Sequence, residues 1–202
     1  NICIEDKKFP QLPGATSWLC NSTHSSGGTW GVHVTTVPAT NAGRTKVALL
    51  LHSFVGKNRC SALFAPYCPH LSEAGYDIIA IDFPGYGRSC DTLVPARSNI
   101  DEDLVVAILK AFGVEVADGG KEVTFIGAGG GCGTFARMYV KYPSLFGGHH
   151  VFHNPVLQEH PKLGETMLRK GCDIYALLSE GWDKDDYNFI IGDLNYRMET
   201  TF

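Results

Sequence analysis

The sequence has no long hydrophobic run and no excess of basic charge. Its strongest apolar run, Val47–Leu51, is far shorter than the roughly 18 residues that a membrane-spanning helix needs. The 17 basic residues are outnumbered by 21 acidic ones, and the net charge of −4 argues against a nucleic-acid-binding surface. With 44% apolar and 19% charged residues, the 202-residue chain has the composition of one globular domain.

The sequence also lacks paired cysteine spacings. No C-x-x-C pair occurs, which argues against a metal cluster or a disulfide framework and leaves no expected cofactor. Reduced thiols are typical of an intracellular compartment, so we expect a cytoplasmic protein. The chain starts at Asn1 and shows no signal or transit segment, so a processed protein, a trimmed chain and a fragment all stay open. The cysteines are Cys3, Cys20, Cys60, Cys68, Cys90, Cys132 and Cys172.

Short apolar runs separated by helical patterns make up the middle of the chain. These runs predict four strands, the first three fully buried, at 46–52, 76–82, 123–126 and 149–153. Helices are predicted over 58–74 (interrupted by Pro66 and Pro69), 101–112 and 134–142. The alternation of strands and helices predicts an α/β fold, with a mostly parallel sheet and helices on both faces.

The chain divides into three parts by composition. Residues 1–45 are rich in Gly, Ser, Thr and Pro, and the β-branched stretch 29–37 within them predicts a half-exposed antiparallel strand. Residues 46–160 form the expected α/β core. The pattern does not specify how the C-terminal segment, 161–202, packs.

A glycine-rich stretch, Val123–Gly133, is the centre of the predicted core. Its letters V-T-F-I-G-A-G-G-G-C-G run from β-favouring residues into a tight turn, and a helical pattern follows. Strand, sharp turn and helix are the setting of the G-x-S-x-G motif, in which a serine stands at the apex. Here both outer glycines are present and Gly129 stands in the place of the serine.

Three motifs in order resemble the α/β-hydrolases. Leu49–Phe54 is similar to that family's strand and "HGF" oxyanion loop, with Ser53 replacing the usual glycine. Gly75–Ser89 resembles its "GY-x-V-x-x-x-D-x-PG-x-G-x-S" segment, and the glycine turn follows one helix later. The compact spacing is similar to that of small ABHD14-like members. The resemblance implies an α/β-hydrolase-like fold, which we expect to be truncated at its C-terminal end.

In working members of this family a serine attacks an acyl carbonyl, a histidine takes its proton, and an acid orients the histidine. The resemblance implies that the backbone amides of Phe54 and Gly130 bind the oxyanion, and that Gly129 leaves the nucleophile position without a side chain. Cys132 is the nearest thiol and an alternative nucleophile, but it lies three residues past the apex.

The other two triad members are also in question. The resemblance places the histidine near the C-terminus, beyond the acid. Asp183, after the strand-like stretch 174–178, is the matching acid, and a solvated loop carboxylate explains it equally well. The four late histidines all precede Asp183, and we interpret them as ordinary core or surface residues; they are His149, His150, His153 and His160.

A second resemblance lies in the tail of the chain. Asp186–Arg197 is similar to the "F-x-x-GDLNYR" strand and loop of inositol polyphosphate 5-phosphatases. That resemblance implies roles for Asp193 and Asn195 in activating water beside Mg²⁺, with Arg197 in the same loop. The remaining motifs of that family are not recognisable, and the same letters also fit a strand followed by a turn.

These observations lead to three hypotheses. The first is a catalytically impaired α/β-hydrolase-fold protein that binds a small-molecule ligand or a protein partner. The second is an active, serine-independent hydrolase, esterase-like, with Cys132 as the nucleophile. The third is a fragment of an Mg²⁺-dependent inositol polyphosphate 5-phosphatase.

Overall fold

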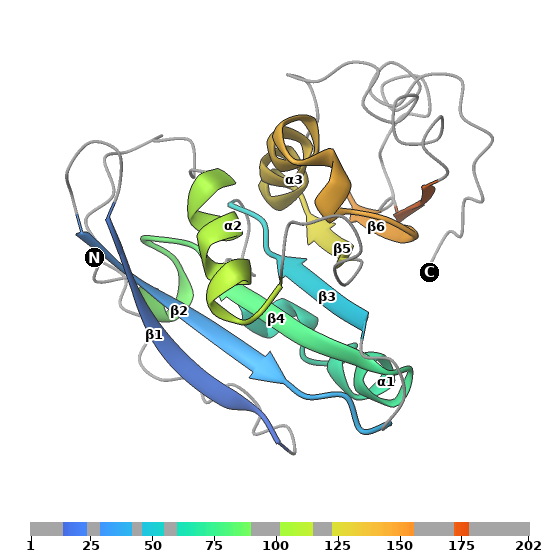
Figure 1. Ribbon diagram of the computed structural model, residues 1–202, viewed down its shortest axis with the longest axis horizontal. Coiled ribbons are helices and arrows are strands. Elements are labelled where there is room, and N and C mark those ends of the chain that lie inside the picture. Colours follow the sequence, from blue (N-terminus) through green and yellow to red (C-terminus); the bar gives the residue numbers. More distant parts are fainter. Residues whose placement is uncertain are drawn as a thin grey trace.

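A computed structural model gives the fold of the chain. It describes residues 14–23, 29–41, 46–54, 60–89, 102–114, 123–155 and 172–177. These residues build a seven-stranded sheet in the order β1-β2-β4-β3-β5-β6-β7 (Figure 1). The strands are β1 (Thr16–Thr23), β2 (Thr29–Val37), β3 (Lys46–Leu51), β4 (Tyr76–Asp82), β5 (Val123–Ala128), β6 (His149–His153) and β7 (Asp173–Leu177).

The sheet is mostly parallel, as predicted. β1 pairs antiparallel with β2, and β2 pairs antiparallel with β4. From β4 to β7 every pair of neighbouring strands is parallel. Carboxyl ends of parallel strands meet at one edge of a sheet, so the loops after β3, β4, β5 and β6 lie together at that edge.

Helices cover both faces of the sheet. The helical elements are η1 (Ser61–Phe64), α1 (Cys68–Glu73), η2 (Gly87–Ser89), α2 (Glu102–Ala111), α3 (Gly130–Lys141) and η3 (Pro143–Leu145). On one face, Leu49 and Leu51 of β3 belong to the apolar core that α2 and α3 share. On the other face, Ala48 and Leu50 pack with Phe64 and Cys68 from η1 and α1. Because β3 is buried from both sides, its sequence is an unbroken apolar run.

Most predicted elements are confirmed, with corrections at their ends. The interrupted helix is two pieces, η1 and α1, separated at Pro66, and the part before residue 60 lies outside the described residues. The helix predicted from residue 134 begins four residues earlier, at Gly130, because tertiary contacts hold the glycines in place. β1 was not predicted as a strand, since its sequence is rich in Ser and Thr and the side chains of residues 16–21 are exposed or half-buried. The division of the chain at residues 45 and 160 stays a prediction.

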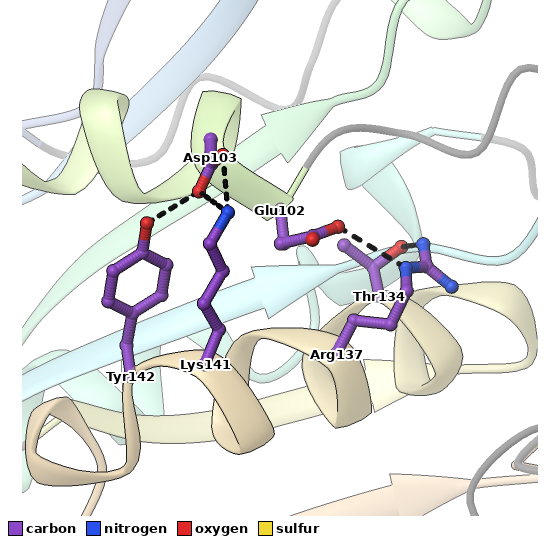
Figure 2. Close-up of polar contacts among 6 residues, drawn as sticks. All are labelled: Glu102, Asp103, Thr134, Arg137, Lys141 and Tyr142. Carbon is purple, nitrogen blue, oxygen red and sulfur yellow. Dashed lines mark hydrogen bonds and ion pairs between the residues drawn. The ribbon is translucent and has the colours of Figure 1, made fainter.

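Polar side chains hold α3, the helix that starts at the glycine turn, against α2. Asp103 of α2 accepts hydrogen bonds from Lys141 Nζ at 2.7 Å and from the Tyr142 hydroxyl at 2.5 Å. Glu102 pairs with Arg137 Nε at 3.4 Å (Figure 2). Such half-exposed pairs contribute little stability each. They join the start of α2 to the C-terminal half of α3 and to Tyr142.

Candidate functional site

Three loops at the carboxyl edge of the sheet form the candidate site. The first follows β3 and contains His52, Ser53 and Phe54. The second runs from Phe83 to Ser89 after β4, and the third is the one-residue turn at Gly129 between β5 and α3. Ligands of open α/β sheets bind at this edge of the strands.

Gly129 connects β5 to α3 in a backbone conformation that side chains disfavour. Its φ of +49° and ψ of −117° lie outside the regions that L-residues ordinarily adopt. Its N–H donates to the carbonyl of His153 at the end of β6 (3.0 Å), and its own carbonyl accepts from the N–H of Cys132 (3.1 Å). The turn is therefore anchored on both sides, and the chain enters α3 within a single residue.

The glycines of the turn are required by the close approach of β3 and its loop. A Cβ atom at Gly131 would lie 2.4 Å from the carbonyl oxygen of Leu51, and one at Gly130 would lie 2.1 Å from Cδ2 of Phe54. A Cβ at Gly129 would lie 2.4 Å from Oγ of Ser53. Real Cβ atoms do not approach neighbours so closely. Three consecutive glycines thus allow the turn to pack directly against three parts of the β3 end.

His52 links the first two loops as a neutral side chain. Its Nδ1–H donates to the carbonyl of Ser53 (2.7 Å), and its Nε2 accepts from the N–H of Phe83 (3.0 Å). Burial lowers the pKa of His52, so the neutral ring that this bonding pattern needs is also the favoured one. With both nitrogens engaged, His52 holds the loops together and has no lone pair left for proton transfer.

An aromatic cluster lines the space beside the turn. The ring of Phe54 lies 5.0 Å from that of Phe83 and 5.6 Å from that of Tyr86, measured between centroids. Phe54 and Tyr86 are half-buried, whereas Phe83 is fully buried. The exposed parts of the Phe54 and Tyr86 rings give the site an apolar surface.

The loop after β4 is held by a buried carboxylate. Asp82 accepts hydrogen bonds from the N–H of Ser61 (2.5 Å) and from the N–H of Arg88 (3.1 Å). Gly87 is needed here because a Cβ atom would lie 2.6 Å from the Asp82 carboxylate, and its φ is +52°. The carboxylate thus organises the loop through backbone N–H groups.

Two further residues tie this loop to the antiparallel end of the sheet. The Ser89 hydroxyl donates to the carbonyl of Asp82 (2.6 Å) and accepts from the N–H of His33 in β2 (2.8 Å). The Arg88 guanidinium reaches the hydroxyl groups of Ser17 (2.8 Å) and Thr35 (3.4 Å). These contacts were not predicted from the sequence, although Asp82, Arg88 and Ser89 lie within the motif that carries the resemblance.

The structure brings the predicted oxyanion-loop residues together. Phe54 and Gly130 are in contact through the Phe54 ring, and Gly129 lies next to them. Cys132 is in the first turn of α3, fully buried, and burial raises the pKa of its thiol well above the usual range. Whether the amides of Phe54 and Gly130 bind an oxyanion stays a prediction.

The late histidines occupy different environments. His149 is exposed, and its Nδ1 lies 3.0 Å from Asp173 of β7. His150 is fully buried and accepts from the N–H of Phe125 through Nδ1 (3.1 Å). His153 is half-buried at the end of β6, beside Asn154. His160 lies outside the described residues, as do the predicted residues Asp183, Asp193, Asn195 and Arg197, so their roles stay predictions.

Within the described ranges, no three His, Cys, Asp or Glu side chains are grouped in a way that could hold a metal ion. The helices of the same ranges include none with the length and apolar character needed to cross a membrane.

Comparison with known proteins places the fold. A family model described as alpha/beta hydrolase fold matches residues 47–171, which is more than half of the chain. No curated protein sequence matches.

Several solved structures are similar. A predicted CIB-like hydrolase from Thermoplasma acidophilum has a TM-score of 0.57 at 20% identity, covering 93% of this chain and 87% of that one. A probable hydrolytic enzyme from Pseudomonas aeruginosa has a TM-score of 0.56 at 23% identity, covering 70% and 42%. A serine hydrolase from Cycloclasticus zankles has a TM-score of 0.53 at 22% identity, covering 74% and 50%. The chain thus spans half or less of the length of the last two.

Proposed function

The chain belongs to the α/β-hydrolase fold family, and we propose that it is a catalytically impaired member that acts as a ligand- or protein-binding subunit. One observation carries the proposal. Gly129 stands at the sharp turn between β5 and α3, where the family's G-x-S-x-G motif has its serine. Acyl transfer in this family begins with attack by that serine hydroxyl. A glycine has no group that can make this attack.

What surrounds the turn is suited to binding. The loops after β3 and β4 are held in place by His52 and Asp82, so their geometry does not depend on a bound molecule. Phe54 and Tyr86 offer half-exposed rings beside the turn. Preorganised loops with an apolar surface reduce the entropy lost when a ligand or a partner side chain is ordered.

The alternative with Cys132 as nucleophile has less support. A nucleophilic cysteine must be a thiolate and must reach its substrate. The Cys132 side chain is fully buried, and its raised pKa keeps it protonated near neutral pH. We therefore expect iodoacetamide to modify Cys132 more slowly than the half-buried thiols Cys20 and Cys60. Mass spectrometry of the modified peptides would locate the adducts, and preferential modification of Cys132 would revive the alternative.

Hydrolysis of p-nitrophenyl acetate tests the proposal. We expect wild-type protein to release p-nitrophenol no faster than the Gly129→Ala variant, because neither carries a nucleophile at the turn. Unfolded protein at equal concentration measures the non-specific reaction of surface amines. Saturable turnover by the wild type that Gly129→Ala removes would contradict the proposal.

Thermal unfolding tests the binding half of the proposal. A panel of small carboxylic acids and their esters should include compounds that raise the melting temperature, since binding to the folded state alone stabilises it. Phe54→Ala, which removes the ring beside the turn, should reduce the shift. An unchanged melting temperature across the panel would remove the small-ligand form of the proposal and leave the protein-binding form, to be tested with candidate partners.

We also propose that the protein is located inside the cell. The described cysteines are all free thiols: Cys20, Cys60, Cys68, Cys132 and Cys172. Free thiols persist in reducing compartments. Their oxidation state in protein isolated under thiol-blocking conditions would test this placement.

A further inference from the structure

Ser53 and Gly129 lie close together just beyond two neighbouring strands. β3 and β5 are paired in parallel up to Leu51 and Gly127. Ser53, in the loop after β3, and Gly129, in the turn after β5, each follow two residues beyond this last pair. The Ser53 side chain is half-buried and Gly129 is buried behind it.

The Ser53 side chain fills the space into which a side chain at position 129 would extend. A Cβ atom built on Gly129 lies 2.4 Å from Oγ, 3.1 Å from Cβ and 3.7 Å from Cα of Ser53. Rotation of the Ser53 hydroxyl would relieve the first contact. It would leave the second, which is tighter than most Cβ contacts in proteins, because the position of the Ser53 Cβ atom is set by the backbone.

The sequence shows a matching exchange at the same two positions. Ser53 replaces the glycine of the oxyanion-loop motif, and Gly129 replaces the serine of the G-x-S-x-G motif. Each replacement by itself is a single departure from a pattern. Both departures fall where a Cβ atom added at Gly129 would meet the Ser53 side chain.

We propose that Ser53 and Gly129 form an exchange pair, in which the site carries a serine side chain on one loop or the other but not on both. Ser53 is then a positioning residue that decides whether residue 129 can hold a nucleophile. The hydroxyl group that an entering molecule meets beside the turn comes from the β3 loop. Restoring serine at position 129 requires glycine at position 53. This inference goes beyond the proposed function and holds whether or not the site binds a ligand.

A double-mutant cycle on stability tests the exchange pair. The four proteins are the wild type, Ser53→Gly, Gly129→Ser and the double variant, each unfolded in urea. Both variants with serine at position 129 share the strain of its positive φ, so the interaction energy isolates the steric contact. We expect Gly129→Ser to raise the unfolding equilibrium constant about tenfold more with Ser53 present than with glycine at position 53, within the range of contacting pairs. Ser53→Ala, which keeps Cβ, should relieve less of the loss than Ser53→Gly.

Two controls make the outcome specific. Gly113 also has a positive φ, +77°, but a Cβ atom there would meet nothing within 4 Å. Gly113→Ser should therefore lose the same amount of stability with either residue at position 53. Gly131→Ala, whose clash is with the Leu51 backbone, should not be relieved by Ser53→Gly.

The cycle remains decisive if one variant folds poorly. Gly129→Ala introduces only the Cβ atom and can replace Gly129→Ser in the same four-protein scheme. Additive losses in both versions of the cycle would overturn the exchange pair. Coupling that is equally large in the Gly113 control would also overturn it, since the effect would then not depend on contact.

Discussion

The loop after β4 and the turn after β5 lie at the same edge of the sheet but are built in opposite ways. The β4 loop is held by a buried carboxylate, Asp82, which accepts from the N–H of Arg88 in the loop and from the N–H of Ser61 in η1. In the β5 turn, Gly129, Gly130 and Gly131 have no side chains and can therefore pack closely against the end of β3 and its loop. The β4 loop thus depends on a polar side chain, whereas the β5 turn depends on three residues that have no side chain.

The residues that hold the site in place are therefore not those at which a reaction would occur. The β4 loop keeps the polar residues of the motif that resembles the family, and all of them serve the fold. The β5 turn enters α3 sharply through a single residue, Gly129, which has no side chain. The groups that hold the site together therefore differ from the position at which the family's motif carries its serine.

Removing the carboxylate should produce the largest effect. Asp82→Ala leaves the buried N–H of Ser61 and the half-buried N–H of Arg88 without their acceptor, and a buried group without a partner costs about 1–3 kcal/mol. We expect a loss of about 3 kcal/mol in the free energy of unfolding, measured in urea. Asp82→Asn, which keeps one acceptor oxygen, should lose clearly less. A loss below about 1 kcal/mol for Asp82→Ala would mean that the β4 loop does not depend on this carboxylate.

A methyl group in the β5 turn tests the opposite construction. Gly131 is in α3, where replacement of glycine by alanine ordinarily stabilises a helix by about 1 kcal/mol. The new Cβ would lie 2.4 Å from the Leu51 carbonyl oxygen, which is backbone and cannot move aside. We expect Gly131→Ala to destabilise by about 2 kcal/mol, as in overpacked cores. A higher free energy of unfolding for Gly131→Ala, measured in urea, would show that the added methyl group meets no clash there.

The pH dependence of stability tests the contact between His150 in β6 and β5, the strand that leads into the turn. Burial lowers the pKa of His150 to about 4, while its Nδ1 accepts from Phe125 in β5. A depressed histidine pKa means that the unfolded chain takes up a proton first, so stability present above about pH 6.5 is lost as the pH falls toward 4. His150→Gln, which keeps an acceptor but does not titrate, should reduce the stability difference between pH 7.5 and pH 5. Equal differences in wild type and variant would contradict this assignment.

The polar contacts between α2 and α3 should produce the smallest effect. Hydrogen bonds from Lys141 and Tyr142 lower the pKa of Asp103, so its contribution is present above the carboxylate's usual pKa and is lost at lower pH. Asp103 is about half exposed, and solvent and salt screen the pairing. Asp103→Asn should lose much less stability than Asp82→Ala, and the loss should shrink in 1 M NaCl. A loss comparable to that of Asp82→Ala would mean that the polar contacts between α2 and α3 contribute as much stability as the buried Asp82 carboxylate.

Much of the fold could be predicted because the buried strands have a simple signature. β3 and β4 are apolar runs without alternation, and α2 has one apolar face with acidic residues in its first turn. β1 has no such signature, because it is held by backbone pairing with β2 and the side chains of residues 16–21 are exposed or half-buried. The start of α3 at Gly130 was also out of reach, because glycine has a low helix propensity and the contacts with β3 outweigh it.

The roles of the candidate-site residues stay predictions, and their detailed geometry could not be predicted from the sequence. The resemblance named Phe54, Gly129 and Gly130, and in the structure the Phe54 ring lies against Gly130, the residue after Gly129. The approach of Ser53 to Gly129 depends on the register of two parallel strands and could not be predicted from the spacing of residues along the chain. The locking of His52 and Asp82 by backbone groups also needs the folded loops.

The central proposal is that the chain is a catalytically impaired member of its family, and intact-protein mass spectrometry after treatment with a fluorophosphonate tests it most directly. These reagents modify an activated serine hydroxyl and add their mass to the protein. The account predicts that the mass of the folded wild-type protein stays unchanged, with an active serine hydrolase as positive control. One full equivalent of adduct on the folded protein, absent after unfolding and located on a serine by peptide mapping, would contradict it.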